Sequence, residues 1–196
     1  EVPIYVAAQE VMDRIVGFEI HRGILAIGKR TSALSLEAHL EALGSGPLLL
    51  VAAIGVVNND NMGGIFRNAA AFGVNSVLLD SVSCDPMYRK SIRVSVGGVL
   101  KVPFCRAESA DEMLHSLERH SVTPVALSPH GEHELHAYRF PKRCALLLGA
   151  EGAGLSADVL RRSTTVKIQM EGGFDSLNVA TTSGIVLYGA RSSSVG

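Results

Sequence analysis

The stretch LLLVAAIGVVNNDNMGGIFRNAAAFGVNSVLL, residues 48–79, decides the fold. It opens with the apolar run LLLVAAIGV (48–56), passes through a segment of helical character at residues 61–72, and closes with the apolar run VNSVLL (74–79). Continuous runs rich in Val, Leu and Ile are typical of strands that are buried on both faces, as in a parallel sheet. The stretch therefore predicts a strand–helix–strand unit.

The same alternation continues along the chain. Ser109 and Glu112 have the spacing of a capping box, and Ser156 precedes a short helical segment that it can cap. Strands that alternate with helices predict an α/β fold, with a mostly parallel sheet flanked by helices. The further expected strands are 100–105, 122–127, 144–150 and 164–170, and the further expected helices are 86–97, 109–120, 157–162 and the last segment, 175–191.

Length and composition set limits on partners. The 196 residues are enough for one full-sized domain, or for one domain and a fragment of another. Charged residues make up 19% and apolar residues 47%, so a large core is expected, with apolar surface left for a partner subunit. The formal net charge of −1 excludes a strongly basic coat, so nucleic-acid binding would have to come from local basic clusters.

The first residues differ in character from the rest. ALGSGP (42–47) precedes the first strong strand, and we expect a domain boundary there, with residues 1–46 separate from 47–196. The chain begins with Glu1 rather than Met, so a trimmed start could hide a targeting segment and an organellar location.

The cysteines and the apolar runs bear on the compartment. The three cysteines, Cys84, Cys105 and Cys144, are odd in number and widely spaced, so they predict neither a disulfide framework nor a zinc site. This usage favours an intracellular, reducing compartment such as the cytoplasm. The longest apolar run, GPLLLVAAIGVV, is too short to span a bilayer, and no membrane association is expected.

The first of three glycine-marked junctions is NNDNMGGIFRNAAAFG (58–73), directly after the first strand. Ligands of α/β sheets bind at the carboxyl ends of strands, where this junction lies. Asn61 is a candidate helix cap, Gly63 and Gly64 allow another segment to approach closely, and Arg67 lies in the helix that follows. The alternative is a capped helix with a solvent-facing arginine.

The second junction is LLLGAEGAGLSADVL (146–160), in which Gly152, Gly154 and Ala157 match the dinucleotide fingerprint G-x-G-x-x-A. Glu171 follows roughly 20 residues further on, where the fingerprint has an acidic residue. A dinucleotide fold normally adds several βαβ units after this turn, and only about 40 residues remain. A dinucleotide-dependent oxidoreductase and a glycine-rich turn without a ligand are both open alternatives.

The third junction is IQMEGGFDSLNVATTSGIVLYGAR (168–191), where a strand ends, a glycine pair turns, and Ser176 and Asn178 begin a helix. Helix N-termini present free N–H groups that suit carboxylates and phosphates. Capping accounts for Ser176 better than for Asn178.

Taken together, the three junctions resemble the motifs of the SpoU (TrmH-like) branch of the SPOUT RNA methyltransferases. The resemblance runs in order over roughly residues 47–190, and VPIYVAAQEVMDRIVG with HRGILAI (21–27) looks like the end of a ribosomal-protein-like RNA-binding domain. The matching residues are Asn61, Gly63, Arg67 and Ala69 in the first motif, Gly149, Glu151, Gly152 and Gly154 in the second, and Ser176, Leu177, Asn178, Val179 and Gly184 in the third.

The resemblance implies a C-terminal deep trefoil knot that holds S-adenosylmethionine, and a homodimer with the active site near the subunit interface. It implies methylation of a ribose 2′-hydroxyl in RNA, with ribosomal RNA favoured over transfer RNA. A non-catalytic RNA-binding protein with the same fold is a further alternative.

The resemblance also implies catalytic roles. Arg67 has the central one, and since the pKa of a guanidinium lies above about 12, we expect it to position the phosphate and the hydroxyl rather than act as a base. Asn61 and Glu151 would orient Arg67 and the substrate, while Ser176 and Asn178 would bind substrate or hold the catalytic loop.

For the cofactor, the resemblance implies recognition by the main chain around the knot, and no metal is expected. The residues expected to bind S-adenosylmethionine are Leu127, Gly149, Ile168, Met170 and Leu177.

Local clusters of positive charge are expected to hold the RNA, although each could equally be a solvated face. HGEHELH (130–136) spaces three histidines, and we expect a surface loop there rather than a metal site. The basic residues are Arg89, Lys90 and Arg93, with a second set at Arg139, Lys142 and Arg143.

Overall fold

The computed structural model describes residues 2–17, 19, 28–30, 34–171 and 176–193. Contacts divide the chain into two compact units, Glu1–Ser32 and Ala33–Gly196. In the described part of the first unit, helix α1 (Gln9–Val16) buries none of its residues and ends at Gly17, whose φ of 79° is left-handed. Residues 21–27, which contribute to the resemblance with an RNA-binding domain, lie outside the described residues.

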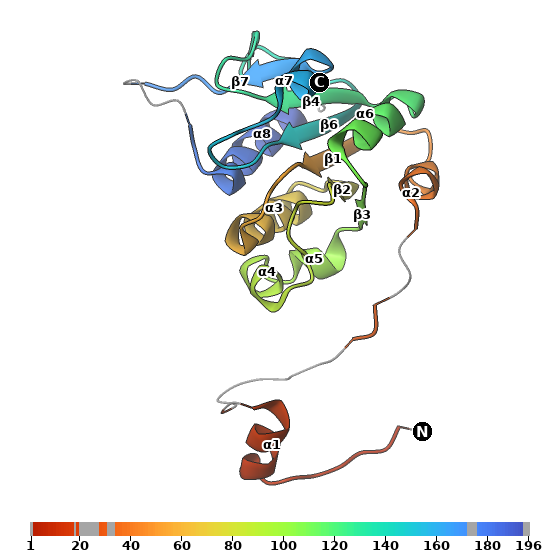
Figure 1. The fold of residues 1–196 in the computed structure, drawn as a ribbon, viewed down its shortest axis with the longest axis vertical. Coiled ribbons are helices and arrows are strands. Elements are labelled where there is room, and N and C mark those ends of the chain that lie inside the picture. The colour runs from red at the N-terminus through yellow and green to blue at the C-terminus, as the bar shows by residue number, and fades with distance from the viewer. Residues whose placement is uncertain (1, 18, 20–27, 31–33, 172–175, 194–196) are drawn as a thin grey trace. The chain divides into compact units, whose positions relative to one another are not determined.

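The second unit is an α/β fold, as predicted (Figure 1). Its described strands form one seven-stranded sheet in the order β3-β2-β1-β6-β4-β7-β5, and every neighbouring pair is parallel. The elements are α2 (Leu36–Ala42), β1 (Leu48–Ala53), α3 (Asn59–Ala71), β2 (Ser76–Leu79), α4 (Arg89–Val94), α5 (Gly98–Lys101), β3 (Phe104–Arg106), α6 (Ala110–Arg119), β4 (Thr123–Leu127), β5 (His133–Glu134), β6 (Arg143–Leu148), α7 (Ala157–Arg161), β7 (Thr164–Lys167) and α8 (Val179–Ser193).

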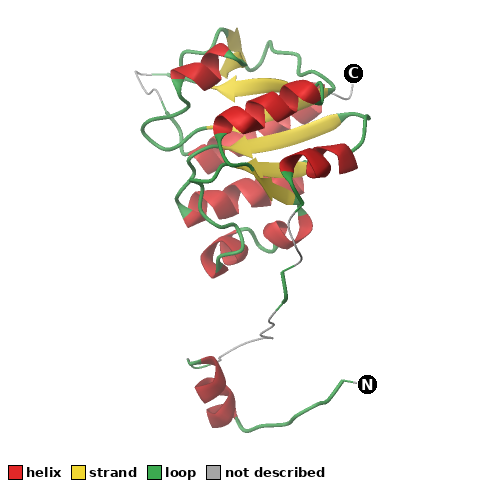
Figure 2. Ribbon diagram, turned by 45° about the vertical axis from the view of Figure 1, so that its right-hand side comes forward, coloured by secondary structure: helices red, strands yellow, loops and turns green. Residues whose placement is uncertain are grey.

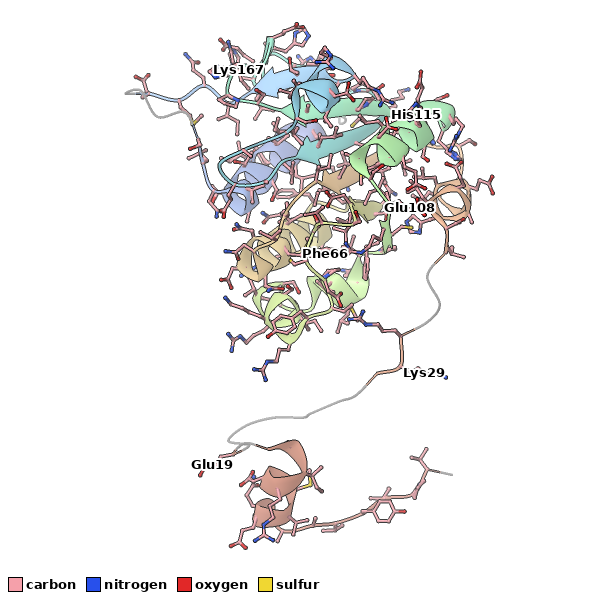
Figure 3. All side chains as sticks on the ribbon, in the orientation of Figure 1. Glu19, Lys29, Phe66, Glu108, His115 and Lys167 are labelled. Atoms are coloured by element: carbon pink, nitrogen blue, oxygen red, sulfur yellow. The ribbon has the colours of Figure 1, made fainter. Side chains whose placement is uncertain are left out.

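Helices cover both faces of the sheet (Figure 2). Successive strand residues point to opposite faces, and both sets are apolar here, so both faces must be covered. In β1, Val51 and Ala53 pack under α3 and α8, whereas Leu50 and Ala52 pack under α2, α6 and α7. Phe66 of α3, labelled in Figure 3, is fully buried on the first face. Burial on both faces explains why the strands read as continuous apolar runs.

On the second face, α2 is fastened to α6 by a carboxylate. Glu37 accepts hydrogen bonds from the Ser116 hydroxyl and the Arg119 guanidinium, and its Oε2 lies 3.1 Å from Nε2 of His120. These contacts, the Ser116 hydrogen bond foremost, lower the pKa of Glu37 to about 2. Helix α2 therefore belongs with the sheet, although it precedes the boundary expected at residues 42–47.

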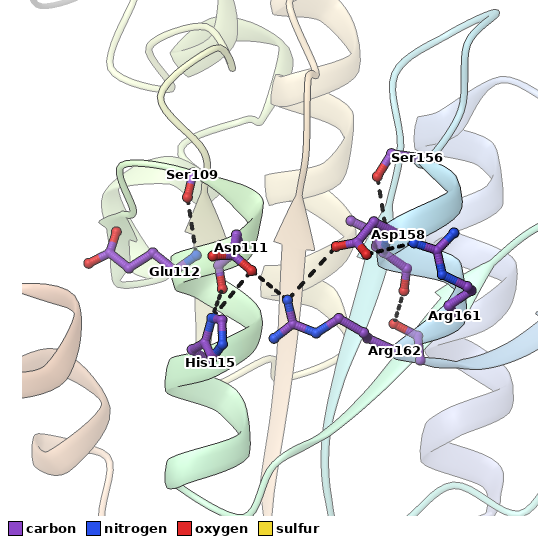
Figure 4. Close-up of polar contacts among 10 residues, drawn as sticks. Ser109, Asp111, Glu112, His115, Ser156, Asp158, Arg161 and Arg162 are labelled. Carbon is purple, nitrogen blue, oxygen red and sulfur yellow. Dashed lines mark hydrogen bonds and ion pairs between the residues drawn. The ribbon is translucent and has the colours of Figure 1, made fainter.

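Ion pairs fasten α7 beside α6 on the same face (Figure 4). Nη1 of Arg162 lies 2.5 Å from Oδ1 of Asp111 and 3.9 Å from Oδ2 of Asp158. The Ser156 hydroxyl accepts a hydrogen bond from the N–H of Val159, so Ser156 caps α7 as predicted. These contacts fix the helix that follows the second glycine-marked junction.

Several expected boundaries were wrong. The strand expected at 100–105 is the short helix α5 followed by β3, because Gly97 (φ 81°) starts a helical turn and β3 begins only after Pro103. The helix expected at 86–97 is only α4, since residues 85–88 form a turn before it. The surface loop expected at 130–136 contains β5, two residues that add an edge strand to β7. Among the described helices, none is both long and apolar enough to cross a membrane.

Candidate active site

The first junction begins α3 with Asn58 rather than with Asn61. The Oδ1 atom of Asn58 accepts hydrogen bonds from the N–H groups of Asp60 (2.8 Å) and Asn61 (3.4 Å), which makes Asn58 the cap. The prediction that Asn61 caps the helix was therefore wrong. The Asn61 side chain is 5% exposed and its amide is available for contacts with other segments.

Three of the predicted catalytic residues meet at the carboxyl end of the sheet. Nδ2 of Asn61 donates a hydrogen bond to Oε1 of Glu151 (2.6 Å), and Nδ2 of Asn178 donates to Oδ1 of Asn61 (2.8 Å) and to Oε1 of Glu151 (3.3 Å). The three side chains come from the three glycine-marked junctions. We call this group the Asn61–Glu151–Asn178 cluster.

Asn178 uses both ends of its amide. Its Oδ1 accepts hydrogen bonds from the N–H groups of Ala180 (3.0 Å) and Thr181 (3.2 Å), so Asn178 caps α8 while its Nδ2 joins the cluster. The prediction that capping accounts better for Ser176 than for Asn178 was wrong. One side chain thereby fixes where α8 begins relative to Asn61 and Glu151. Residues 172–175, where a glycine turn was expected, lie outside the described residues.

Close packing of the backbones of α3 and α8 holds the elements that carry Asn61 and Asn178. A Cβ added to Gly64 would lie 2.6 Å from Cβ of Ala180, so α3 and α8 approach as closely as a glycine permits. Nδ2 of Asn68 donates to the Ala180 carbonyl oxygen (2.7 Å) and to the Ser183 hydroxyl (2.9 Å). The sequence analysis did not identify Asn68 as a site residue. Its position directly after Arg67, as a polar residue in an otherwise apolar helix, was the available signal.

A second network holds the loop between β1 and α3. The Asp80 side chain is 6% exposed, and its oxygens accept hydrogen bonds from the N–H groups of Gly55 (3.0 Å) and Ser83 (2.9 Å). The Ser83 hydroxyl accepts one from the N–H of Val56 (3.0 Å). Asp80 and Ser83 were not among the predicted residues. Through this network the end of β2 positions the loop that leads to Asn58 and α3.

A cavity of about 410 Å³ opens beside the cluster. It is bounded by the loops that follow β4 and β6, by the end of β7, and by the residues that begin α8. All five residues predicted to bind the cofactor line it, together with Glu151 and Ser176: they are Leu127, Gly149, Ile168, Met170 and Leu177. The described residues that line the cavity include two titratable side chains, Glu151 and His130.

The glycines of the second junction shape the cavity wall. Gly152 (φ 82°) and Gly154 (φ 66°) are left-handed, and the N–H of Gly154 donates to the Ala150 carbonyl oxygen (3.0 Å), so the loop folds back on itself. A Cβ on Gly149 would lie 2.5 Å from the carbonyl carbon of Gly154. The turn alone accounts for these glycines, and the helix after it has only five residues. Nothing in this geometry favours the dinucleotide fingerprint.

Arg67 stands apart from the cluster. Its side chain is exposed on α3 and, within the described part of the chain, makes no hydrogen bond or ion pair and does not line the cavity. A Cβ on Gly98 would lie 3.3 Å from Cα of Arg67, so the α4–α5 turn presses on this part of α3. The structure thus brings together four of the five predicted catalytic residues with the cavity and leaves Arg67 open to solvent.

The basic clusters have different surroundings. Arg89, Lys90 and Arg93 are all exposed, and Lys90 pairs with Asp60 at 2.7 Å. Arg143 donates to the carbonyl oxygens of Gly44, Gly46 and His120, so it ties α2 and α6 to β6. Among the described residues, no group of three or more His, Cys, Asp or Glu side chains is arranged to hold a metal ion.

A parallel α/β sheet with polar side chains gathered beside a cavity at its carboxyl end is the arrangement in which proteins of the α/β class bind ligands. Residues 48–188 match the SpoU rRNA Methylase family, and the chain belongs to this family. The resemblance seen in the three sequence motifs is therefore confirmed.

Relatives and solved structures agree with the assignment. The chain is 39% identical over 195 residues to an uncharacterized tRNA/rRNA methyltransferase of Mycobacterium bovis, which covers 95% of this chain and 65% of the relative. It is 31% identical over 188 residues to a 23S rRNA (guanosine-2′-O-)-methyltransferase of Ralstonia nicotianae, covering 94% of this chain and 74% of the relative.

Among solved structures, the AdoMet-bound rRNA methyltransferase from Sinorhizobium meliloti superposes with a TM-score of 0.78 at 26% identity, covering 94% of this chain and 70% of that one. The SpoU methyltransferase AviRb from Streptomyces viridochromogenes gives 0.74 at 28% identity, covering 80% and 63%. The chain spans only part of its relatives, and it covers 65% of the length of the mycobacterial relative.

Proposed function

We propose that the chain is an S-adenosylmethionine-dependent RNA methyltransferase that methylates a ribose 2′-hydroxyl, with ribosomal RNA as the favoured substrate and transfer RNA as the second candidate. One observation carries the proposal. The Asn61–Glu151–Asn178 cluster borders a cavity lined by every residue predicted to bind the cofactor, in a chain of the SpoU family.

The lining of the cavity suits the proposed cofactor. All five residues line the cavity. We assign the aliphatic side chains of Leu127 and Met170 to the adenine ring, and the main-chain groups of Gly149, Ile168 and Leu177 to polar contacts with the cofactor. Main-chain groups of irregular loops have free donors and acceptors, so recognition needs no charged side chain. When bound, S-adenosylmethionine supplies an electrophilic methyl group on a sulfonium.

Methyl transfer is an in-line displacement. The 2′-oxygen of the ribose would bond to the methyl carbon while the sulfur keeps the electron pair of the broken carbon–sulfur bond, and the hydroxyl proton would pass to the RNA phosphate that Arg67 positions. The protein must align the two reactants, which reduces the entropic part of the barrier. We assign Arg67 to the RNA phosphate and the hydroxyl, the cluster to orientation of the substrate, and Ser176 to a substrate contact at the cavity.

The exposed position of Arg67 fits a site that is completed by RNA and by a second subunit. Helix α8 leaves Tyr188 66% exposed and Ile185 39% exposed, which supports a homodimer. The deep trefoil knot is part of the proposal, and so is a remnant of an RNA-binding domain in the residues that precede α2. The remnant expected at residues 1–46 is shortened because α2 packs with the sheet. The three cysteines are free thiols, as suits a reducing compartment such as the cytoplasm.

Calorimetric titration with S-adenosylmethionine, S-adenosylhomocysteine and NAD tests the proposal. We expect saturable binding of the first two ligands at one site per subunit and no binding of NAD. NAD binding alone would refute the methyltransferase in favour of the oxidoreductase. Absence of binding by all three ligands would refute the enzyme and leave an RNA-binding protein of the same fold.

A further inference from the structure

The turn between α4 and α5 contains a strained residue. Val96 has φ 52°, in the left-handed region that β-branched residues avoid. The N–H of Val96 donates to the Arg93 carbonyl (3.2 Å), and that of Gly97 donates to the Ile92 carbonyl (3.3 Å). These two bonds form a Schellman motif, in which the position of Val96 normally holds glycine.

Among the residues that the structure describes, packing does not offset the strain at Val96. Its side chain is 73% exposed, so it contributes little to the core. Ser121, which follows α6, occupies the same position of a second Schellman motif at φ 54°, but it is a small polar residue. Strained backbone positions cluster at active sites and ligand clamps, and packing does not account for an exposed valine at such a position.

The turn lies next to the proposed catalytic arginine. A Cβ on Gly98 would lie 2.7 Å from the carbonyl oxygen of Phe66 and 3.3 Å from Cα of Arg67, so the turn is packed against α3 at this point. A Cβ on Gly63 would lie 2.7 Å from Cβ of Val94, which fixes α4 along the same helix. The turn therefore has a fixed position relative to Arg67.

The surroundings of Val96 are basic and partly aromatic. Residues 86–103 contain no acidic residue, in a chain whose net charge is −1. Arg89 and Arg93 lie four residues apart on one face of α4, and both are exposed. Tyr88 directly precedes the helix and is 49% exposed. We call Tyr88, Arg89, Arg93 and Val96 the α4 face.

We propose that the α4 face docks the single-stranded part of the RNA substrate beside the reacting nucleotide, with the arginines on phosphates and with Tyr88 and Val96 against bases. Positive charge combined with aromatic and apolar side chains is the chemistry that binds single-stranded nucleic acid. Asp60 pairs with Lys90, which leaves the charges of Arg89 and Arg93 for phosphates. This inference rests on the proposed function, because it takes RNA as the substrate.

Fluorescence anisotropy with a fluorescein-labelled single-stranded RNA of mixed sequence, recorded over a range of salt concentrations, tests the docking. The double variant Arg89→Gln/Arg93→Gln should weaken binding at least about tenfold at low salt. The slope of log K against log salt should become shallower by about 1.4, since each lost phosphate contact on a single strand contributes about 0.7.

Val96→Gly gives the sharper result, because stability and binding should change in opposite directions. Relief of the left-handed strain should raise the melting temperature, while loss of the apolar contact should weaken RNA binding about threefold with an unchanged salt slope. Ser121→Gly is the matched control, since it changes the same position of the second motif. It should raise the melting temperature and leave RNA binding unchanged.

Two results would overturn the docking surface. One is unchanged RNA affinity and salt slope in both α4-face variants. The other is a change of sedimentation coefficient in these variants without a change in RNA affinity, which would make the face a contact between two copies of the chain. Titration of the same preparations with S-adenosylmethionine separates the two proposals. A chain that binds RNA through the α4 face but binds no S-adenosylmethionine supports the docking and refutes methyl transfer.

Discussion

Substitution of Asn178 separates its two roles. Asn178→Asp retains an oxygen that accepts the N–H groups of Ala180 and Thr181, and aspartate caps helices as well as asparagine does. It removes the Nδ2 donor and places a second carboxylate where Nδ2 lies 3.3 Å from Oε1 of Glu151. Asn178→Ala removes both the cap and the donor.

The expected magnitudes follow from these contacts. Loss of the cap costs about 0.5–2 kcal/mol of the free energy of unfolding. In both variants Oδ1 of Asn61 also loses its donor, which adds about 1 kcal/mol. In Asn178→Asp the cap remains, so the loss of stability comes from that missing donor and from repulsion by Glu151 rather than from the helix start. We expect its methyl-transfer rate to fall at least about 100-fold, which corresponds to a barrier raised by about 2.7 kcal/mol.

The assay pairs urea denaturation with transfer of a tritiated methyl group to transcribed ribosomal RNA. Ser109→Ala is the matched control, because the Ser109 hydroxyl accepts the N–H of Glu112 at the start of α6, on the other face of the sheet. It should lower stability as a lost cap does and leave transfer unchanged. Wild-type transfer by Asn178→Asp would refute the reasoning, since the link to Asn61 and Glu151 would then be dispensable.

Four further outcomes are expected. Gly64→Ala should destabilise by about 1–3 kcal/mol in urea, because the added Cβ meets Ala180 at 2.6 Å, while Gly46→Ala, with open space around it, should not. Asp80→Asn leaves one of two buried N–H groups without an acceptor and should cost about 1–3 kcal/mol, with slower transfer. The pKa of Glu37 is lowered from 4.5 to about 2, so its stabilising contribution is present above pH 4.5 and is lost as the pH falls toward 2. Glu37→Gln should therefore reduce the dependence of the melting temperature on pH between these two values. Arg67→Ala should abolish transfer and leave the calorimetric affinity for S-adenosylmethionine unchanged.

The core of the fold was predictable because burial on both faces forces apolar runs. The limits of the strands were not, because the loops that follow them are also apolar. Residues 54–56 continue the run of β1, yet the chain leaves the sheet where Gly55 adopts φ 70°. The edge strand β5 is His133–Glu134, and two polar residues that pair on one side carry no periodic signal.

The candidate site was predictable as a set of residues but not as a geometry. The motif resemblance identified Asn61, Glu151 and Asn178, which are brought into contact from positions 90 and 117 residues apart. No local pattern in a single sequence indicates such contacts. Two asparagines and an aspartate adjoin Asn61, so capping strength alone did not distinguish Asn58 from Asn61 as the start of α3.

The two sides of the site differ in how far the chain builds them. On the cavity side, a Cβ added to Gly149 would lie 2.5 Å from the carbonyl carbon of Gly154, and the hydrogen bonds of Asn178 hold the start of α8. We therefore expect the described walls of the cavity to need little ordering when a ligand binds. On the other side, the side chains of Arg67 and of the α4 face are exposed, whereas the backbones that carry them lie in or beside packed helices. A preformed pocket binds its ligand without the cost of ordering the protein, whereas exposed arginines become ordered only when phosphates arrive. Cofactor affinity should therefore be a property of the folded chain, and the complete catalytic arrangement should form only when RNA is bound.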